Sequence, residues 1–246
     1  TRQLDDGVRV LHLEVQPNPD DSNAPSLCHG ACILGHERLV DGLAEIRAFV
    51  AAHPDELVTL LMETSNGSTG ADVARAMNDA GLAPYARAHA LGAAWPTLRA
   101  MLDDGERVVA LLSSDAPAAE PWLLDRFAFT WETPWDNESL ADFRRCDADR
   151  GTKGDAIYVV DNYLEDMAVA STAEAATTNT DPFLVDRQLL CQGAEMQLPN
   201  YVMVNFYEIG DVFHVVDVLN GFADAPPFDP SDFPPGEGGG GAGGGG

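Results

Sequence analysis

The sequence has 246 residues, of which 45% are hydrophobic, and carries 40 acidic against 14 basic side chains for a formal net charge of −26. This hydrophobic fraction is enough for one large core or two small ones. The negative charge argues against a nucleic-acid partner, because such binding requires Lys and Arg to neutralise phosphates, and no apolar stretch is long enough for a transmembrane helix.

Short apolar runs alternate along the chain with segments of helical periodicity. Strands that alternate with helices and are continuously hydrophobic indicate a parallel sheet covered on both faces. This pattern suits either a doubly wound sheet or a (β/α)8 barrel, and no glycine-rich phosphate-binding motif follows a strand to favour a nucleotide site. We predict strands at 8–15, 57–62, 107–112, 127–130, 156–160 and 201–206, and helices at 36–53, 69–82, 95–102, 166–178, 181–191 and 211–219.

The last part of the chain differs in composition from the rest. From 226 onward it is rich in Pro and Asp and then becomes almost pure glycine. Such a segment has too few apolar side chains to offset the entropy of ordering it. We therefore predict one folded domain over 1–225 and a disordered Pro/Gly-rich tail over 226–246.

The four cysteines are even in number and contain no CxxC pair. Two disulfides, Cys28–Cys32 and Cys146–Cys191, would fit an exported protein. Four reduced thiols are the alternative interpretation.

Polar side chains occur where the predicted strands end, which in parallel α/β folds is the edge that carries the active site. Glu63 is the strongest case, because a carboxylate directly after six apolar residues is unfavourable unless it is paired or binds a metal. Each of the other polar residues could instead cap the next helix or complete a turn. For 161 and 162 we give the site and the structural interpretation equal weight. The residues in these positions are His12, Glu14, Glu63, Asp161, Asn162 and Asn205.

His29 lies between two closely spaced cysteines and is followed by Gly30. A loop that is tightened by a disulfide can present an imidazole in a fixed direction, as a general acid or base requires. A lone histidine in a loop is more often an ordinary surface residue, so this assignment depends on further context.

That context is a resemblance spread over most of the chain. The ordered motifs QLDDGVRVLHLEV, CHGACILG, HPDELVT and WPTL together resemble the phospholipase C-like phosphodiesterases, an X-domain-like superfamily that includes bacterial phosphatidylinositol-specific enzymes. The motifs occupy 3–15, 28–35, 53–59 and 95–98, and 199–202 and 219–221 also look like family features. The resemblance implies an α/β fold of the TIM-like (β/α) barrel type, here without its first strand.

The resemblance also implies a two-histidine mechanism, in which one histidine acts as general base and the other as general acid. His29 falls on the second histidine. The first is expected in a segment resembling T-H-N upstream of Gln3, and no other histidine of this sequence matches it. This favours either a chain that has lost its N-terminal strand or an inactive form.

Glu14 and Glu63 match positions that hold calcium in the metal-dependent relatives and carry basic side chains in the metal-independent ones. Two carboxylates beside a phosphodiester would repel it unless a divalent cation intervened, and oxygen ligands favour Ca²⁺ or Mg²⁺. We expect His12, Asp161, Asn162 and Asn205 to bind substrate or support the site. Asn205 matches a position where some relatives carry an aspartate that orients the first histidine.

Together these features predict a secreted or extracytoplasmic monomer. It would hydrolyse the phosphodiester of a phosphoinositide-like or related lipid headgroup by metal-assisted histidine catalysis. A glycerophosphodiester phosphodiesterase is the nearest enzymatic alternative, although its usual His-Arg-Gly and Glu-Asn-Thr segments are not seen. An inactive secreted binding module is the alternative of a different class.

Overall fold

The computed structural model describes residues 2–21, 24–30, 32–164 and 171–234. It divides the chain into two compact units, Thr1–Phe129 and Thr130–Gly246. Each unit is described below by itself, and the assignment of 1–225 to one domain stays a prediction.

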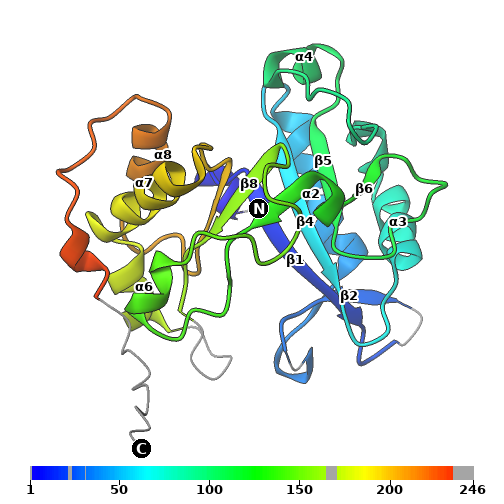
Figure 1. The fold of residues 1–246 in the computed structure, drawn as a ribbon. Coiled ribbons are helices and arrows are strands. Elements are labelled where there is room, and N and C mark those ends of the chain that lie inside the picture. Colours follow the sequence, from blue (N-terminus) through cyan, green and yellow to red (C-terminus); the bar gives the residue numbers. More distant parts are fainter. Residues whose placement is uncertain (1, 22–23, 31, 165–170, 235–246) are drawn as a thin grey trace, which may run out of the picture. The chain divides into compact units, whose positions relative to one another are not determined.

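The first unit is built on a sheet with the strand order β3-β2-β1-β4-β5-β6 (Figure 1). Four strands run parallel: β1 (Val10–Pro17), β4 (Val58–Thr64), β5 (Val108–Leu112) and β6 (Leu123–Asp125). The strands β2 (Pro25–Leu27) and β3 (Glu37–Arg38) add antiparallel pairing at the other edge of β1. The mixed α/β fold with parallel strands is therefore confirmed.

Helices cover one face of this sheet through the apolar face that the sequence predicts. The longest, α2 (Leu39–Ala52), buries Leu39, Leu43, Ile46, Phe49 and Val50 against the strands. Thr69 accepts a hydrogen bond from the backbone of Asp72 and so begins α3 (Gly70–Asp79) as the N-cap of a capping box. The unit also contains α1 (Arg2–Asp5), α4 (Leu98–Asp103), α5 (Arg126–Phe129), and the 3-10 turns η1 (Cys32–Leu34) and η2 (Ala83–Tyr85).

The strand predicted over 127–130 is wrong for most of its length. Residues Arg126–Phe129 form the short helix α5, and the strand β7 begins only at Thr130. The side chain of Asp125 accepts a hydrogen bond from the backbone N–H of Phe127 and so starts a helical turn. An apolar run this short has no periodicity that separates a strand from a helix.

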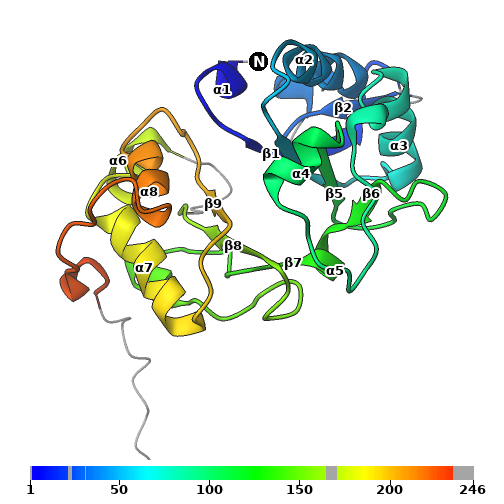
Figure 2. The same ribbon diagram turned by 90° about the horizontal axis from the view of Figure 1, so that it is seen from above.

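The second unit contains the parallel strands β7 (Thr130–Glu132), β8 (Ile157–Asp161) and β9 (Tyr201–Met203) in the order β7-β8-β9 (Figure 2). Trp131 stacks on Tyr158, with ring centroids 3.9 Å apart, beside the Cys146–Cys191 disulfide. The helices of this unit are α6 (Thr172–Thr178), α7 (Phe183–Glu195), α8 (Val212–Leu219), η3 (Leu140–Arg144) and η4 (Pro230–Asp232). The first part of the helix predicted over 166–178 lies outside the described residues.

Most described side chains of 226–234, the first part of the segment predicted as a disordered tail, are exposed, but Phe233 is buried in the second unit. Phe233 is only 1% exposed and lies 5.1 Å from the ring of Phe183, in a cluster with Phe143. The guanidinium of Arg144 donates a hydrogen bond to the carbonyl of Phe233. Composition alone misses this because one buried aromatic ring anchors a segment that is otherwise polar. Residues 235–246 lie outside the described part of the chain.

Both expected disulfides, Cys28–Cys32 and Cys146–Cys191, are present. Within the ranges that the structure describes, no helix combines the length and the apolar character needed to cross a bilayer.

Candidate active site

The carboxyl ends of β1 and β4 bring together four of the side chains that the sequence singles out. Glu14 and Glu63 are direct register partners in this parallel pair, so both side chains leave the sheet on the same face. His12 lies two residues before Glu14 and therefore shares that face, whereas Leu11 and Val15 point into the core under the helices.

The four side chains form two histidine–carboxylate pairs. His12 Nε2 lies 3.4 Å from Glu63 Oε2, and His29 Nε2 lies 3.8 Å from Glu14 Oε2. The His29 side chain is 81% exposed, whereas that of Glu14 is only 22% exposed. An accessible imidazole beside a more buried carboxylate can exchange protons with a bound molecule while the carboxylate orients its ring.

Glu14 is also held from its other side. Its Oε1 accepts hydrogen bonds from Gln16 Nε2 at 2.6 Å and from Ser65 Oγ at 3.1 Å. Neither residue is identified in the sequence as part of a site. The available signal was their spacing, because Gln16 and Ser65 follow Glu14 and Glu63 by two positions and so lie on the same face.

The loop that carries His29 is fastened at several points. The Cys28–Cys32 disulfide spans it, and Gly30 offers its carbonyl to Gln16 Nε2 at 3.3 Å. Gln16 Oε1 in turn accepts from Asn66 Nδ2 at 2.7 Å. The loop is therefore tied to β1 and, through Asn66, to the turn that follows β4.

The donor chemistry of this region suits a hard cation. Glu14 and Glu63 supply two carboxylates from paired positions on adjacent strands, and oxygen donors are the ligands that Ca²⁺ and Mg²⁺ prefer. Among the residues that the structure describes, no three Asp, Glu, His or Cys side chains are grouped so that they alone could hold a metal. An ion held here would complete its shell with water or with oxygens of a bound molecule, as Mg²⁺ often does.

Asp161 and Asn162 lie at the end of β8 in the second unit, and both are fully buried. The backbone N–H of Asp161 donates to Thr133 Oγ1 at 3.0 Å. Asn162 Nδ2 donates to the carbonyl of Thr178 at 2.9 Å, which joins the strand end to the end of α6. These contacts are the kind expected if the residues organise the turn.

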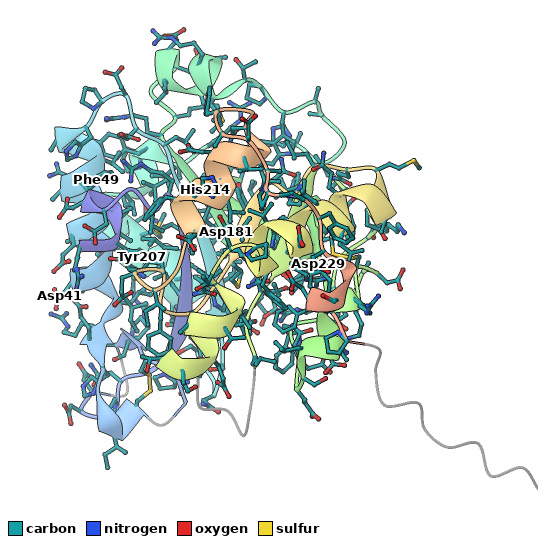
Figure 3. All side chains as sticks on the ribbon, turned by 90° about the vertical axis from the view of Figure 1, so that its left-hand side faces the viewer. Asp41, Phe49, Asp181, Tyr207, His214 and Asp229 are labelled. Carbon is teal, nitrogen blue, oxygen red and sulfur yellow. A yellow bond between two sulfur atoms is a disulfide. The ribbon has the colours of Figure 1, made fainter. Side chains whose placement is uncertain are left out.

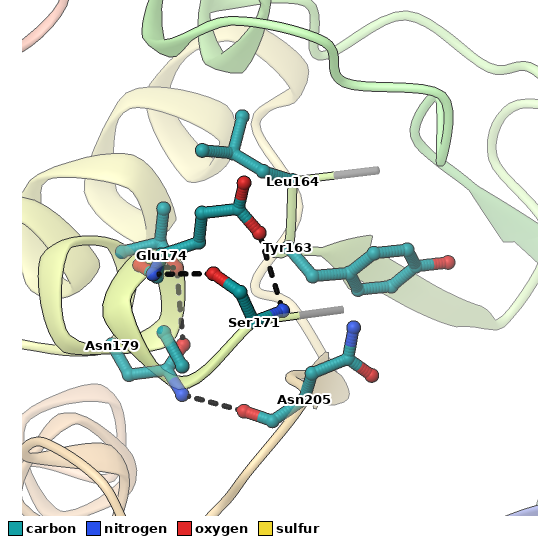
Figure 4. A pocket seen from close by; sticks show the side chains of 8 residues that line it. Tyr163, Leu164, Ser171, Glu174, Asn179 and Asn205 are labelled. Carbon is teal, nitrogen blue, oxygen red and sulfur yellow. Dashed lines mark hydrogen bonds between the residues drawn. The ribbon is translucent and has the colours of Figure 1, made fainter. Parts of the chain in front are cut away.

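Asn205 follows β9 and lines a pocket in the same unit (Figure 4). Its backbone carbonyl accepts from Asn179 Nδ2 at 2.7 Å, while Ser171 and Glu174 cap the start of α6 at the pocket wall. The lining of the pocket consists of Tyr163, Leu164, Ser171, Glu174, Ala175, Thr178, Asn179 and Asn205.

A further histidine–carboxylate pair joins His214 of α8 to Asp181 through Nδ1 and Oδ2 (Figure 3). The backbone N–H of Asp181 also donates a hydrogen bond to Asp211 Oδ2 at 3.0 Å. His214 matches no motif, and 33 positions separate it from Asp181, so the pair becomes visible only in the folded structure.

The chain is similar in sequence to a known protein family. A family model described as PI-PLC X matches residues 1–220. PI-PLC X domain-containing protein 1 of Arthroderma benhamiae is 31% identical over 242 residues, which cover 90% of this chain and 77% of that protein. PI-PLC X domain-containing protein At5g67130 of Arabidopsis thaliana is 26% identical, over 90% of this chain and 54% of that protein.

An uncharacterized secreted protein of Arthroderma benhamiae is 24% identical, over 89% of this chain and 54% of that protein. The chain thus spans about half the length of the last two relatives. No solved structure gives a significant match. Because the family model covers nearly all of the described chain and the first relative exceeds 30% identity, the chain belongs to the PI-PLC X domain family.

Proposed function

We propose that the chain is a phosphoric diester hydrolase of the phospholipase C type, acting on a phosphoinositide-like or related lipid headgroup. The observation that carries this proposal is the His29–Glu14 pair beside the His12–Glu63 pair on one face of a parallel sheet. Family membership supports a phosphodiester as the substrate class.

In this proposal, His29 protonates the leaving oxygen and Glu14 orients its ring. A divalent cation held by Glu14 and Glu63 would neutralise the phosphate charge that these two carboxylates otherwise repel. His12 lies next to Glu63 and would hold that carboxylate in place. A role in substrate binding for Asp161, Asn162 and Asn205 stays a prediction.

A TIM-like (β/α) barrel is the fold that we propose for the domain. The family match supports it, as do parallel strands whose successive side chains are buried on both faces, such as Leu60 and Leu61. We also propose that the protein is secreted and monomeric. The two disulfides support secretion, since such bonds persist in oxidising compartments, and one relative is named a secreted protein.

The proposal is tested by assaying the full-length protein on a chromogenic phosphodiester and on phosphatidylinositol. We expect activity that is lost in chelator and in His29→Ala. His214→Ala is the matched control, because it also removes a histidine paired with a carboxylate and should retain activity. Full activity in chelator would refute the Glu14/Glu63 metal site.

Product analysis separates the alternatives. A cyclic phosphate among the products indicates a lyase-like reaction on a phosphoinositide, whereas preference for glycerophosphodiesters indicates that alternative enzyme class. Failure to cleave any phosphodiester, combined with binding to lipid headgroups, would identify a binding module and overturn the enzymatic proposal.

A further inference from the structure

We propose that Gln16 is a positioning residue, which orients Glu14 and the His29 loop relative to each other. This inference rests on the proposed function, because it assigns a task to a residue beside the same pair. Gln16 lies on β1 two residues after Glu14 and is only 4% exposed.

The side-chain amide of Gln16 uses both of its ends. Its Nε2 donates to Glu14 Oε1 at 2.6 Å and to the carbonyl of Gly30 at 3.3 Å. Its Oε1 accepts from Asn66 Nδ2 at 2.7 Å. Turning the amide over would place a carbonyl oxygen against a carboxylate and an NH₂ group against another NH₂ group, so these neighbours fix its orientation.

The contacts divide the two oxygens of Glu14 between separate tasks. Oε1 accepts hydrogen bonds from Gln16 and Ser65, and Oε2 is the oxygen nearest His29. A hydrogen bond to a charged group contributes more than one between neutral groups, so Gln16 strongly favours one rotation of the carboxylate. Gln16 therefore helps to aim Oε2 at the imidazole.

Gln16 also connects three separate segments of the chain. It lies on the strand that carries Glu14, and it donates a hydrogen bond to Gly30 in the loop of His29. It also accepts a hydrogen bond from Asn66, which lies in the turn after the strand that carries Glu63. Asn66 has a positive φ of 53°, a left-handed conformation that Asn tolerates better than most residues. A shift in one segment is thus transmitted to the other two.

Two substitutions distinguish this role from simple packing. Gln16→Met keeps the volume but removes every polar contact, and we expect kcat to fall about 10- to 100-fold with KM within about twofold, as for residues that orient ligand groups elsewhere. Gln188→Met is the matched control. Gln188 is also a buried glutamine, but it belongs to α7 of the second unit, and its variant should keep wild-type kcat.

A loss that falls on kcat and leaves KM unchanged is the mark of a residue that orients the reacting groups, because binding of the substrate is then unaffected. A wild-type kcat in Gln16→Met, or an equal loss of kcat in Gln188→Met, would overturn the inference.

Hydrogen exchange of the peptide covering 28–35 tests the same claim without a substrate. Exchange should be faster in Gln16→Met than in wild type and unchanged in Gln188→Met. If the wild type cleaves no phosphodiester, the proposed function fails, and this experiment alone decides whether Gln16 positions the loop. Unchanged exchange in Gln16→Met would overturn the inference even if the enzyme is active.

Discussion

Glu14 lies between a histidine and two hydrogen-bond donors, so the orientation of its carboxylate is fixed. The donors of Gln16 and Ser65 satisfy Oε1, and His29 faces Oε2. A carboxylate fixed in this way can serve a cation or an imidazole without first paying the full entropy of ordering its side chain.

Glu14→Gln should therefore reduce phosphodiester cleavage by about 100-fold or more, because a metal supplies several kcal/mol of charge stabilisation. The remaining activity should no longer respond to added calcium. Glu56→Gln is the matched control, since Glu56 lies in the same unit but pairs with Arg9 at 2.7 Å. Steady-state kinetics across a calcium titration make the measurement, and a calcium-responsive Glu14→Gln enzyme would contradict the assignment.

Asp186, in the second unit, allows the link between the pKa of one buried carboxyl group and the stability of the fold to be tested. Burial raises its pKa above the usual value, and the carboxylates of Asp232, Asp229 and Asp181 raise it further, against one hydrogen bond from the backbone N–H of Asp229. Since the folded-state pKa is raised, the stability linked to this proton is present below the ordinary carboxyl pKa. It is lost as the pH rises through the folded value.

Asp186→Asn mimics the protonated form and keeps an acceptor for the backbone of Asp229. We expect it to raise the free energy of unfolding at pH 7 and to lose this advantage in acid. Asp72→Asn should do the opposite, because hydrogen bonds at the capping box lower the pKa of Asp72 despite its desolvation. Denaturant titrations at several pH values measure both, and a destabilised Asp186→Asn at pH 7 would contradict the argument.

The helices that the sequence marks most clearly are found where it predicts them. Thr69 followed by Asp72 marks the start of α3, and the apolar face from Leu39 to Val50 marks α2. The β2–β3 hairpin was not predicted, and neither was α5, because each is only two to four residues long and its local sequence does not set its structure. The positions of Glu14 and Glu63 at strand ends were predictable, but their exact register became visible only in the structure.

Thr69→Ala tests the contribution of the N-cap to the stability of α3. Removal of the capping hydroxyl should lower the free energy of unfolding by about 1 kcal/mol. Thr177→Ala is the control, since Thr177 is exposed within α6 and its hydroxyl donates a long hydrogen bond, of 3.4 Å, to the carbonyl of Ala173. Urea denaturation measures the difference, and equal effects of the two substitutions would contradict the capping assignment.

For the whole molecule, the charge and the C-terminal segment set the conditions under which it functions. A net charge of −26 favours solubility, and it would repel the anionic substrate that we propose unless cations screened it. The composition of the C-terminal segment predicted a tail but could not reveal that Phe233 packs against Phe183, since that contact joins positions far apart in the sequence.

Two truncations therefore should differ. Removing 235–246 should leave the melting temperature unchanged, whereas removing 226–246 should lower it, because the second deletion exposes the pocket of Phe233. Phe233→Ala should lower the free energy of unfolding by about 3–5 kcal/mol. Phe228→Ala should have little effect, because Phe228 is 47% exposed. Calorimetry makes the comparison, and equal melting temperatures for the two truncations would refute the packing of this segment.

The proposed metal-assisted cleavage at Glu14, Glu63 and His29 can be followed by ³¹P NMR of phosphatidylinositol with the full-length protein, in calcium and in chelator, for wild type and His29→Ala. We expect the diester signal to be replaced by product only for the wild type in calcium. Cleavage that persists at the wild-type rate in chelator, or in His29→Ala, would refute this mechanism.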